Sequence, residues 1–205
     1  MAPKIVNKEE KQRAIALASI DIFGEKGFDR TRMEDVAKAA GVGKGTIYEY
    51  FKTKDELMEG AVEALFVDME GSLMPSFDED ASPSDILVLM LEKTIASVKQ
   101  VGFAYRFFLE YMIHISRKDQ SSTFIANVLT GYRHFLCNLI EQGMAVGEFR
   151  EDLAPMETAA ALAAWVDGAI FHWYLLPDTV SFEAMGKRFI DATLNGLRRP
   201  GGKTK

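Results

Sequence analysis

A short stretch of the chain, KAAGVGKGTIYEYFKTKDEL at residues 38–57, gathers cationic and hydroxyl side chains around glycines. Ammonium and phenol groups suit phosphate oxygens, whereas a threonine can hydrogen-bond a base edge or contact the methyl group of thymine. Glycine lets the backbone approach a phosphate closely. These residue types therefore favour recognition of nucleic acid. The positions concerned are Lys44, Gly45, Thr46, Tyr48 and Tyr50.

Two short helices joined by a glycine turn are expected to position these side chains. Val36 and Ala40 recur at helical spacing before Gly41, as do Ile47 and Phe51 after it. Gly41 can take a left-handed conformation at no steric cost, so we expect it to end the first helix. This is a helix-turn-helix pattern, whose second helix fits the major groove of DNA. By periodicity alone, a glycine-broken helix pair with an ordinary solvated face is an open alternative.

Hydroxyl residues are predicted to begin the helices on either side of this second helix. Thr31 with Glu34, and Thr53 with Glu56, have the three-residue spacing of a capping box. Helix N-termini favour anions, so both starts are predicted phosphate sites, with Lys54 beside the second.

The apolar residues recur at helical spacing along the whole chain, without strand-like alternation of any length. We expect an all-α protein of about nine helices, three of them between residues 83 and 146. Residues 1–53 form a three-helix head that binds DNA, and residues 54–205 form a larger helical body for ligand binding and dimerisation. Residues 74–82 read as a linker.

Two later helix starts carry local signals. Ser82, Pro83 and Asp85 supply an N-cap, a proline at the first helical position and an acid in the first turn. Pro155 begins an alanine-rich helix after a break, GEFRED, at residues 147–152.

The charge of the chain is unevenly distributed. Its formal net charge is −6, but residues 1–55 hold 11 Lys and Arg against 9 Asp and Glu. A mildly basic head on an acidic body suggests that only the head meets phosphate. The single cysteine, Cys137, excludes an intrachain disulfide, and the N-terminus has no apolar signal segment. We therefore expect a cytoplasmic protein.

The composition also argues against a membrane protein and an enzyme. The most apolar run, residues 159–177, is interrupted by Asp167 and His172, so we interpret it as a buried helix rather than a membrane span. No nucleophile motif, phosphate loop or metal-ligand spacing is present, which predicts no cofactor and no catalysis. An enzyme built from scattered His and Asp residues is the alternative from a different class.

The segment TRMEDVAKAAGVGKGTIYEYFKTKDEL, residues 31–57, resembles the signature of the TetR family of transcriptional regulators. The preceding AIALASIDIFGEKGFDRT resembles the first helix of that family. The resemblance implies a homodimer whose two heads occupy successive major grooves of a palindromic operator on double-stranded DNA. The DNA contacts that it implies by position are Thr31, Arg32, Lys44, Gly45, Thr46, Tyr48, Tyr50 and Lys54.

Three residues depart from the family pattern. Glu49 stands where many relatives carry an aromatic or neutral residue, so the operator of a relative cannot be transferred to this chain. Met33 replaces a small polar residue and removes one possible phosphate contact. Ala154 stands where relatives often have an aspartate cap, which weakens the start of the helix at Pro155.

The body is expected to bind a mainly apolar small molecule, aromatic or acyl, because GFAYRFFLEYMIHIS at residues 102–116 is apolar almost all round. Aromatic and methionine side chains with a few polar groups could line its pocket. For each of them, plain core packing is the alternative. The candidates are Phe107, Phe108, Tyr111, Met112, Tyr132, Trp165 and His172, with His114 and Asp167 as further polar groups.

Small and apolar residues of the last two predicted helices are expected to form an isologous four-helix dimer interface. Packing within one chain is the alternative. The residues concerned are Ala160, Ala164, Gly168, Phe182, Met185 and Phe189.

The sequence thus predicts a ligand-responsive transcriptional repressor released from its operator by a small molecule. A regulator that senses a protein partner instead, and an activator with the same head, stay open.

Overall fold

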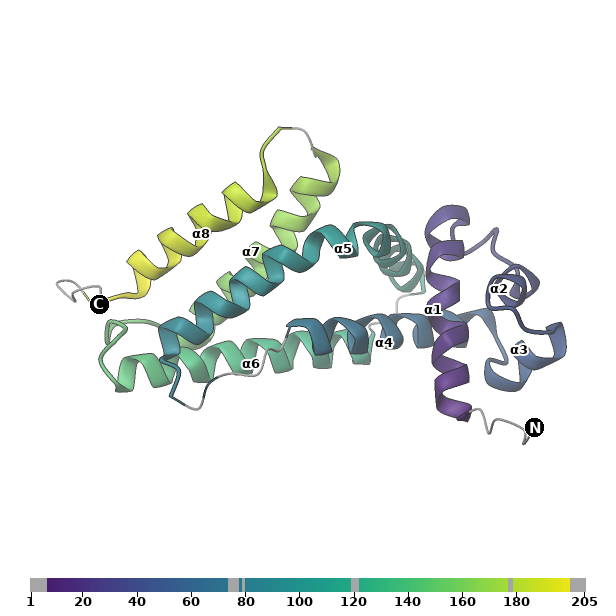
Figure 1. The fold of residues 1–205 in the computed structure, drawn as a ribbon, viewed down its shortest axis with the longest axis horizontal. Helices are drawn as coiled ribbons and strands as arrows, with labels where there is room; N and C mark the ends of the chain where they lie inside the picture. The colour runs from purple at the N-terminus through teal and green to yellow at the C-terminus, as the bar shows by residue number, and fades with distance from the viewer. Residues whose placement is uncertain (1–6, 74–77, 79, 119–121, 177–178, 200–205) are drawn as a thin grey trace. The chain divides into compact units, whose positions relative to one another are not determined.

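The computed structural model describes residues 7–73, 78, 80–118, 122–176 and 179–199. These residues form helices joined by short connections, which confirms the all-α prediction (Figure 1). The described residues form eight helices where about nine were expected, because one helix of 35 residues, α5, occupies much of the segment in which three were predicted. They are α1 Lys8–Lys26, α2 Met33–Ala39, α3 Lys44–Tyr50, α4 Lys54–Leu73, α5 Pro83–Arg117, α6 Thr123–Ala145, α7 Pro155–Leu175 and α8 Phe182–Leu197.

The chain divides into two compact units, and the division does not follow the predicted boundary at residue 53. The first unit comprises residues 1–71 and 101–122, and the second comprises residues 72–100 and 123–205. The first unit therefore contains the end of α5 as well as the predicted head and most of α4. Most of the predicted linker, residues 74–77 and 79, lies outside the described residues.

In the first unit, α2 contacts both α1 and α3. Phe23 of α1, Val36 of α2 and Ile47 of α3 are each 0% exposed and form the centre of the head. Gly41, with a φ of 62°, makes the turn between α2 and α3 as predicted. A left-handed residue at this point is what lets two seven-residue helices cross so closely.

The starts of the helices bear out two of the three predicted caps. The N–H of Glu56 donates to Thr53 Oγ1 at 3.0 Å, and the N–H of Asp85 donates to Ser82 Oγ at 3.2 Å. The predicted capping box of Thr31 with Glu34 is wrong by one residue. Arg32 is the N-cap of α2, and its N–H donates to the carboxylate of Asp35 at 3.2 Å.

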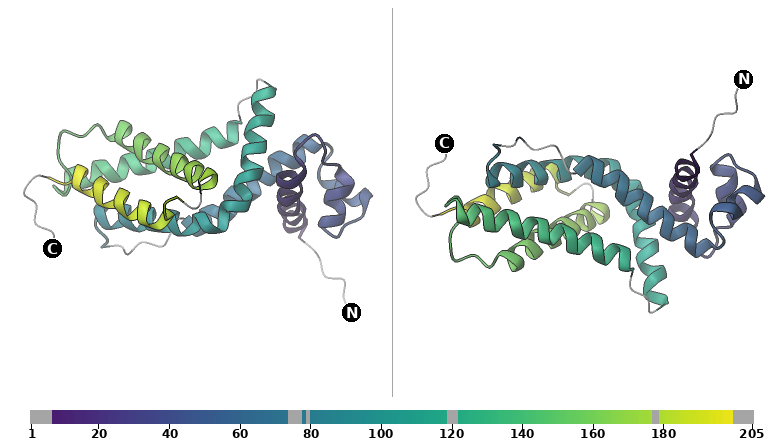
Figure 2. Two further views of the ribbon diagram at one scale, coloured as in Figure 1. Left: turned by 90° about the horizontal axis from the view of Figure 1, so that it is seen from above. Right: turned by 90° about the horizontal axis from the view of Figure 1, so that it is seen from below.

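In the second unit, α6 and α7 lie side by side, with α8 and the first part of α5 along them (Figure 2). All four helices contribute to one apolar cluster. Residues 147–152, where a break between helices was predicted, contact the end of α8. The N–H of Arg150 donates to the carbonyl of Leu197 at 2.9 Å. Beside this contact, Phe149 is 0% exposed and packs on Gly143 of α6.

Within the part of the chain that the structure describes, no helix is both long and apolar enough to cross a membrane. The predicted buried helix, α7, is only half buried within one chain. Leu162 and Ala169 are buried, whereas Ala164 and Phe171 are exposed.

The two glycines of α6 provide a matched test of the packing under Phe149. A Cβ added at Gly143 would lie 2.2 Å from Cδ2 of Phe149, whereas a Cβ at Gly131 would meet nothing within 4 Å. We expect Gly143→Ala to lower the free energy of unfolding by about 1–3 kcal/mol through overpacking. Gly131→Ala should raise it by about 0.5–1 kcal/mol through the lost flexibility of glycine. Urea unfolding followed by circular dichroism measures both, and equal effects of the two changes would contradict the packing.

Candidate nucleic-acid interface

One face of α3 is anchored and the opposite face is exposed. Ile47 is 0% exposed and holds the helix against the head, while Lys44 and Tyr48 project from the other side. The side chain of Lys44 is 68% exposed, and Tyr48 is 37% exposed. Gly45 is also exposed, and a Cβ there would meet nothing within 4 Å. Of the predicted outward positions of this helix, Lys44, Gly45 and Tyr48 are exposed, and the backbone at Gly45 can come close to a partner.

Lys44 has an acidic neighbour that the sequence analysis did not identify. Its Nζ lies 2.7 Å from Oε1 of Glu34, the second residue of α2. The hydrogen bond that Lys44 donates to Glu34 holds the pKa of the Glu34 carboxyl below its usual range and raises the pKa of Lys44. Both groups are therefore charged near neutral pH. The exposed cation predicted to contact DNA is paired with a carboxylate across α2 and α3.

The structure gives Thr31 a different role from the predicted phosphate contact. Its side chain is 2% exposed, and its hydroxyl donates to the carbonyl of Gly27 at 2.8 Å. A second carbonyl, that of Ile22, lies 3.4 Å from the same hydroxyl. Thr31 therefore stabilises the connection between α1 and α2 by an internal hydrogen bond, and its side chain is not available to a ligand.

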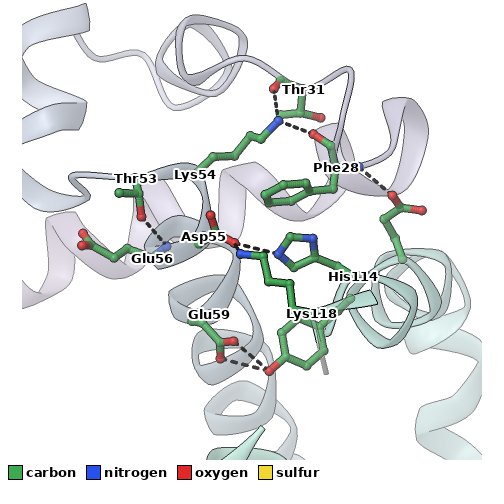
Figure 3. A network of polar contacts seen from close by, with 11 residues as sticks. Phe28, Thr31, Thr53, Lys54, Asp55, Glu56, Glu59, His114 and Lys118 are labelled. Atoms are coloured by element: carbon green, nitrogen blue, oxygen red, sulfur yellow. Dashed lines mark hydrogen bonds and ion pairs between the residues drawn. The ribbon is translucent and has the colours of Figure 1, made fainter. Parts of the chain in front are cut away.

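Lys54 likewise faces the protein (Figure 3). Its Nζ donates to the carbonyls of Phe28 at 2.5 Å and Thr31 at 3.0 Å, and the carbonyl of Asp29 lies 3.3 Å away. The ammonium also lies 4.2 Å from the centroid of the Phe28 ring. Because an ammonium has three protons to donate, these carbonyls account for its hydrogen-bonding capacity. The prediction that Lys54 contacts DNA is therefore replaced by a structural role in fixing residues 28–31.

The end of α5 completes the enclosure of Phe28, which sequence reasoning missed. The N–H of Phe28 donates to Oε1 of Glu110 at 2.7 Å, and its ring lies 3.7 Å from the ring of His114, measured between centroids. His114 is held in turn by Asp55 of α4, at 2.7 Å between Nε2 and Oδ1, and Lys118 pairs with the same carboxylate (Figure 3). These partners lie 59 to 86 positions apart in the sequence, so no local pattern could indicate them.

The other three predicted contacts are Arg32, Thr46 and Tyr50. Arg32 is exposed at the start of α2, and Thr46 is half-buried on α3. Tyr50 is also half-buried, at the end of α3, where it lines a cavity of about 560 Å³ together with Glu59 and Lys118.

The predicted ligand residues divide between the two units. In the first unit, Phe107 and Tyr111 are both 0% exposed and act as core. The ring of Phe107 lies 6.0 Å from that of Phe23, and the hydroxyl of Tyr111 donates to Glu59 at 3.0 Å. Burial, with the nearby Glu59 carboxylate, raises the pKa of Tyr111 to about 12. For Phe107 and Tyr111 the structure therefore supports the alternative, core packing, rather than the lining of a pocket.

The remaining candidates have mixed surroundings. Phe108 of the first unit is half-buried and Met112 is 40% exposed. In the second unit, burial raises the pKa of Tyr132, while His172 is exposed. Trp165 stacks on Phe189 with ring centroids 3.6 Å apart. Tyr132 and Trp165 therefore keep the partly buried position expected of pocket residues.

The predicted dimer residues also separate into two groups. Ala164 and Gly168 are exposed, and a Cβ at Gly168 would meet nothing within 4 Å. Phe182 is only 5% exposed, because it packs edge-on against Trp173 at 6.1 Å, so its place in an intersubunit contact is not supported. Ala160, Met185 and Phe189 are half-buried. Two exposed apolar residues of α7 that the sequence analysis did not name, Phe171 and Leu175, are 44% and 57% exposed.

Comparison with known proteins agrees with this architecture. The family model "Bacterial regulatory proteins, tetR family" matches residues 15–61, and the model "BetI-type transcriptional repressor, C-terminal" matches residues 87–197. The chain is 28% identical over 204 residues to the HTH-type transcriptional regulator TtgR of Pseudomonas putida, covering 93% of this chain and 94% of that protein. It is 23% identical over 198 residues to the fatty acid metabolism regulator protein of Bacillus subtilis, covering 93% and 97%.

A solved structure of a TetR-family transcriptional regulator from Rhodococcus sp. superimposes with a TM-score of 0.77. It is 23% identical and covers 92% of this chain and 98% of that one, which shows a shared fold.

The different roles of the two lysines lead to a prediction about stability. Lys54→Met should lower the free energy of unfolding by about 1–3 kcal/mol, because the carbonyls of Phe28 and Thr31 lose a charged donor. Lys44→Met, which removes the same charge from an exposed site, should leave the free energy of unfolding essentially unchanged. Urea unfolding of both variants tests this difference. Two variants as stable as the parent protein would show that Lys54 has no structural role.

Proposed function

The chain belongs to the TetR family of bacterial regulatory proteins, and from this premise we propose that it is a ligand-responsive repressor that binds a palindromic operator as a homodimer. It is a DNA-binding transcriptional regulator and, like its relatives, not an enzyme. The observation that carries the proposal is the exposed face of α3. A helix held by a buried Ile47, with Lys44 and Tyr48 outward, has the form of a recognition helix.

The structure reduces the set of residues proposed to contact DNA. Lys44 and Tyr48 are exposed and suit phosphate oxygens, while Thr46 lies between them on α3 and suits a base edge. Gly45 allows close approach of the backbone. Arg32 and Tyr50 would contact the flanking backbone. Thr31 and Lys54 act in this proposal only through the position of α2.

The dimer interface is proposed for the exposed face of α7. Ala164, Gly168, Phe171 and Leu175 are exposed and follow one another at spacings of four, three and four residues, which places them on one stripe of the helix. Small residues at 164 and 168 allow a second helix to approach closely. An apolar stripe of this kind is suited to an isologous contact with a second copy of the chain.

The effector is proposed to be a mainly apolar molecule of aromatic or acyl type bound in the second unit near Tyr132 and Trp165. Their partly buried rings supply apolar surface, and the Tyr132 hydroxyl could orient a ligand. The resemblance to a regulator of fatty acid metabolism supports an acyl ligand, and the family model named for a repressor supports repression. Binding would favour a spacing of the two heads that mismatches about 34 Å of duplex.

Salt titration of DNA binding tests the proposed contacts. We expect the dimer to bind the DNA upstream of its own gene with a steep negative slope of log K against log salt. Lys44→Met should flatten this slope by about one unit for each head on every sequence. Thr46→Ala should instead change the preference among operator variants. Fluorescence anisotropy with labelled duplexes measures all three proteins, and a slope unaffected by Lys44→Met would contradict the phosphate contact.

Tryptophan fluorescence tests the proposed effector site. Saturable quenching by dodecanoate or 1-naphthol, with release of the upstream duplex at the same concentrations, is the expected result. Trp165→Phe should remove most of the quenching, whereas Trp173→Phe should retain it. A protein that binds its DNA but responds to neither compound would contradict the proposed ligand class.

A further inference from the structure

The ion pair between Glu34 and Lys44 lies on the surface that faces DNA in the proposed function. Both side chains are exposed, at 49% and 68%, and their charged atoms are 2.7 Å apart. Glu34 also lies in the first turn of α2, where a negative charge is favoured by the helix dipole. The dipole of α2 therefore stabilises the negative charge of Glu34 independently of its contact with Lys44.

Lys44 differs from the other cations around α3 in the kind of partner that it has. Lys52 donates to the backbone carbonyl of Tyr48 at 2.8 Å, and Lys54 donates to the carbonyls of residues 28–31. These partners are uncharged and leave the positive charge uncompensated. Lys26 also pairs with a carboxylate, that of Asp35 at 3.1 Å, but Lys26 belongs to α1 and not to α3. Among these four lysines, Lys44 is therefore the one on α3, and a carboxylate of α2 balances its charge.

We propose that Glu34 competes with DNA phosphate for Lys44 and so limits how tightly the protein holds the DNA backbone. The carboxylate takes one of the three hydrogen-bonding directions of the Lys44 ammonium and balances its charge. A phosphate oxygen that takes the same direction breaks this pair and leaves Glu34 beside a polyanion. Because phosphate contacts are independent of sequence, the restraint acts on all DNA and keeps the protein from binding non-operator sites strongly.

A double-mutant cycle separates competition from simple repulsion. Glu34→Gln removes both the competing charge and its repulsion of phosphate, whereas in a Lys44→Met background only the repulsion can be relieved. We expect Glu34→Gln to raise affinity about three- to tenfold in the parent protein and less than about twofold in the Lys44→Met background. The probe is a labelled 30-base-pair duplex of random sequence, measured by fluorescence anisotropy at 0.1 M salt, beside the upstream duplex of the gene.

Two further variants control for general effects. Glu25 is an exposed carboxylate of α1 with no ion pair among the described residues, so Glu25→Gln makes the same change of charge and should alter affinity less than twofold. Glu34→Asp keeps the charge in the first turn of α2 but shortens the reach to Lys44, and should give an intermediate gain. Thermal unfolding of each variant shows whether the head remains folded.

The outcomes distinguish this inference from the proposed function on which it rests. An equal gain in both backgrounds would leave only repulsion and overturn the competition. A loss of affinity on Glu34→Gln, with the fold intact, would mean that Glu34 orients Lys44 for binding, which also overturns it. A parent protein that binds neither duplex would overturn the proposed function and this inference together.

Discussion

The enclosure of the Lys54 ammonium by backbone carbonyls of residues 28–31 is the contact on which the placement of the exposed face of α3 depends. One cation from the start of α4 donates to two carbonyls of the connection between α1 and α2. Phe28 is held at the same time by Glu110 and His114 from the end of α5. Because α2 begins directly after this connection, and α3 packs on α2, the orientation of α3 follows from these interior contacts.

Charge in the first unit is divided between fixing the fold and meeting a partner. Lys54 donates its hydrogen bonds to backbone carbonyls of the protein, and the Asp55 carboxylate contacts both His114 and Lys118. The exposed cation of α3, Lys44, is matched by Glu34. A basic head therefore presents less free positive charge than its composition indicates.

The elements that could be predicted from the sequence are those fixed by local chemistry. Gly41 and Thr53 carry their signals within a few residues, and both act as expected. Thr31 did not, because its hydroxyl donates to the carbonyl of Gly27 and Arg32, the next residue, is the N-cap of α2. Phe182 was assigned to the dimer because its apolar spacing is the same whether Trp173 or a second chain covers it. The Lys54 and Glu110 contacts depend on tertiary folding, and local spacing cannot reveal them.

Hydroxyl-radical footprinting of the protein, with and without its upstream duplex, tests the central claim most directly. If the exposed face of α3 reads DNA, the duplex will reduce oxidation in the peptide containing Lys44 and Tyr48. Oxidation of the exposed α8 residues Lys187 and Arg188 will be unchanged. Protection confined to α8, with α3 oxidised equally in both states, would contradict the account.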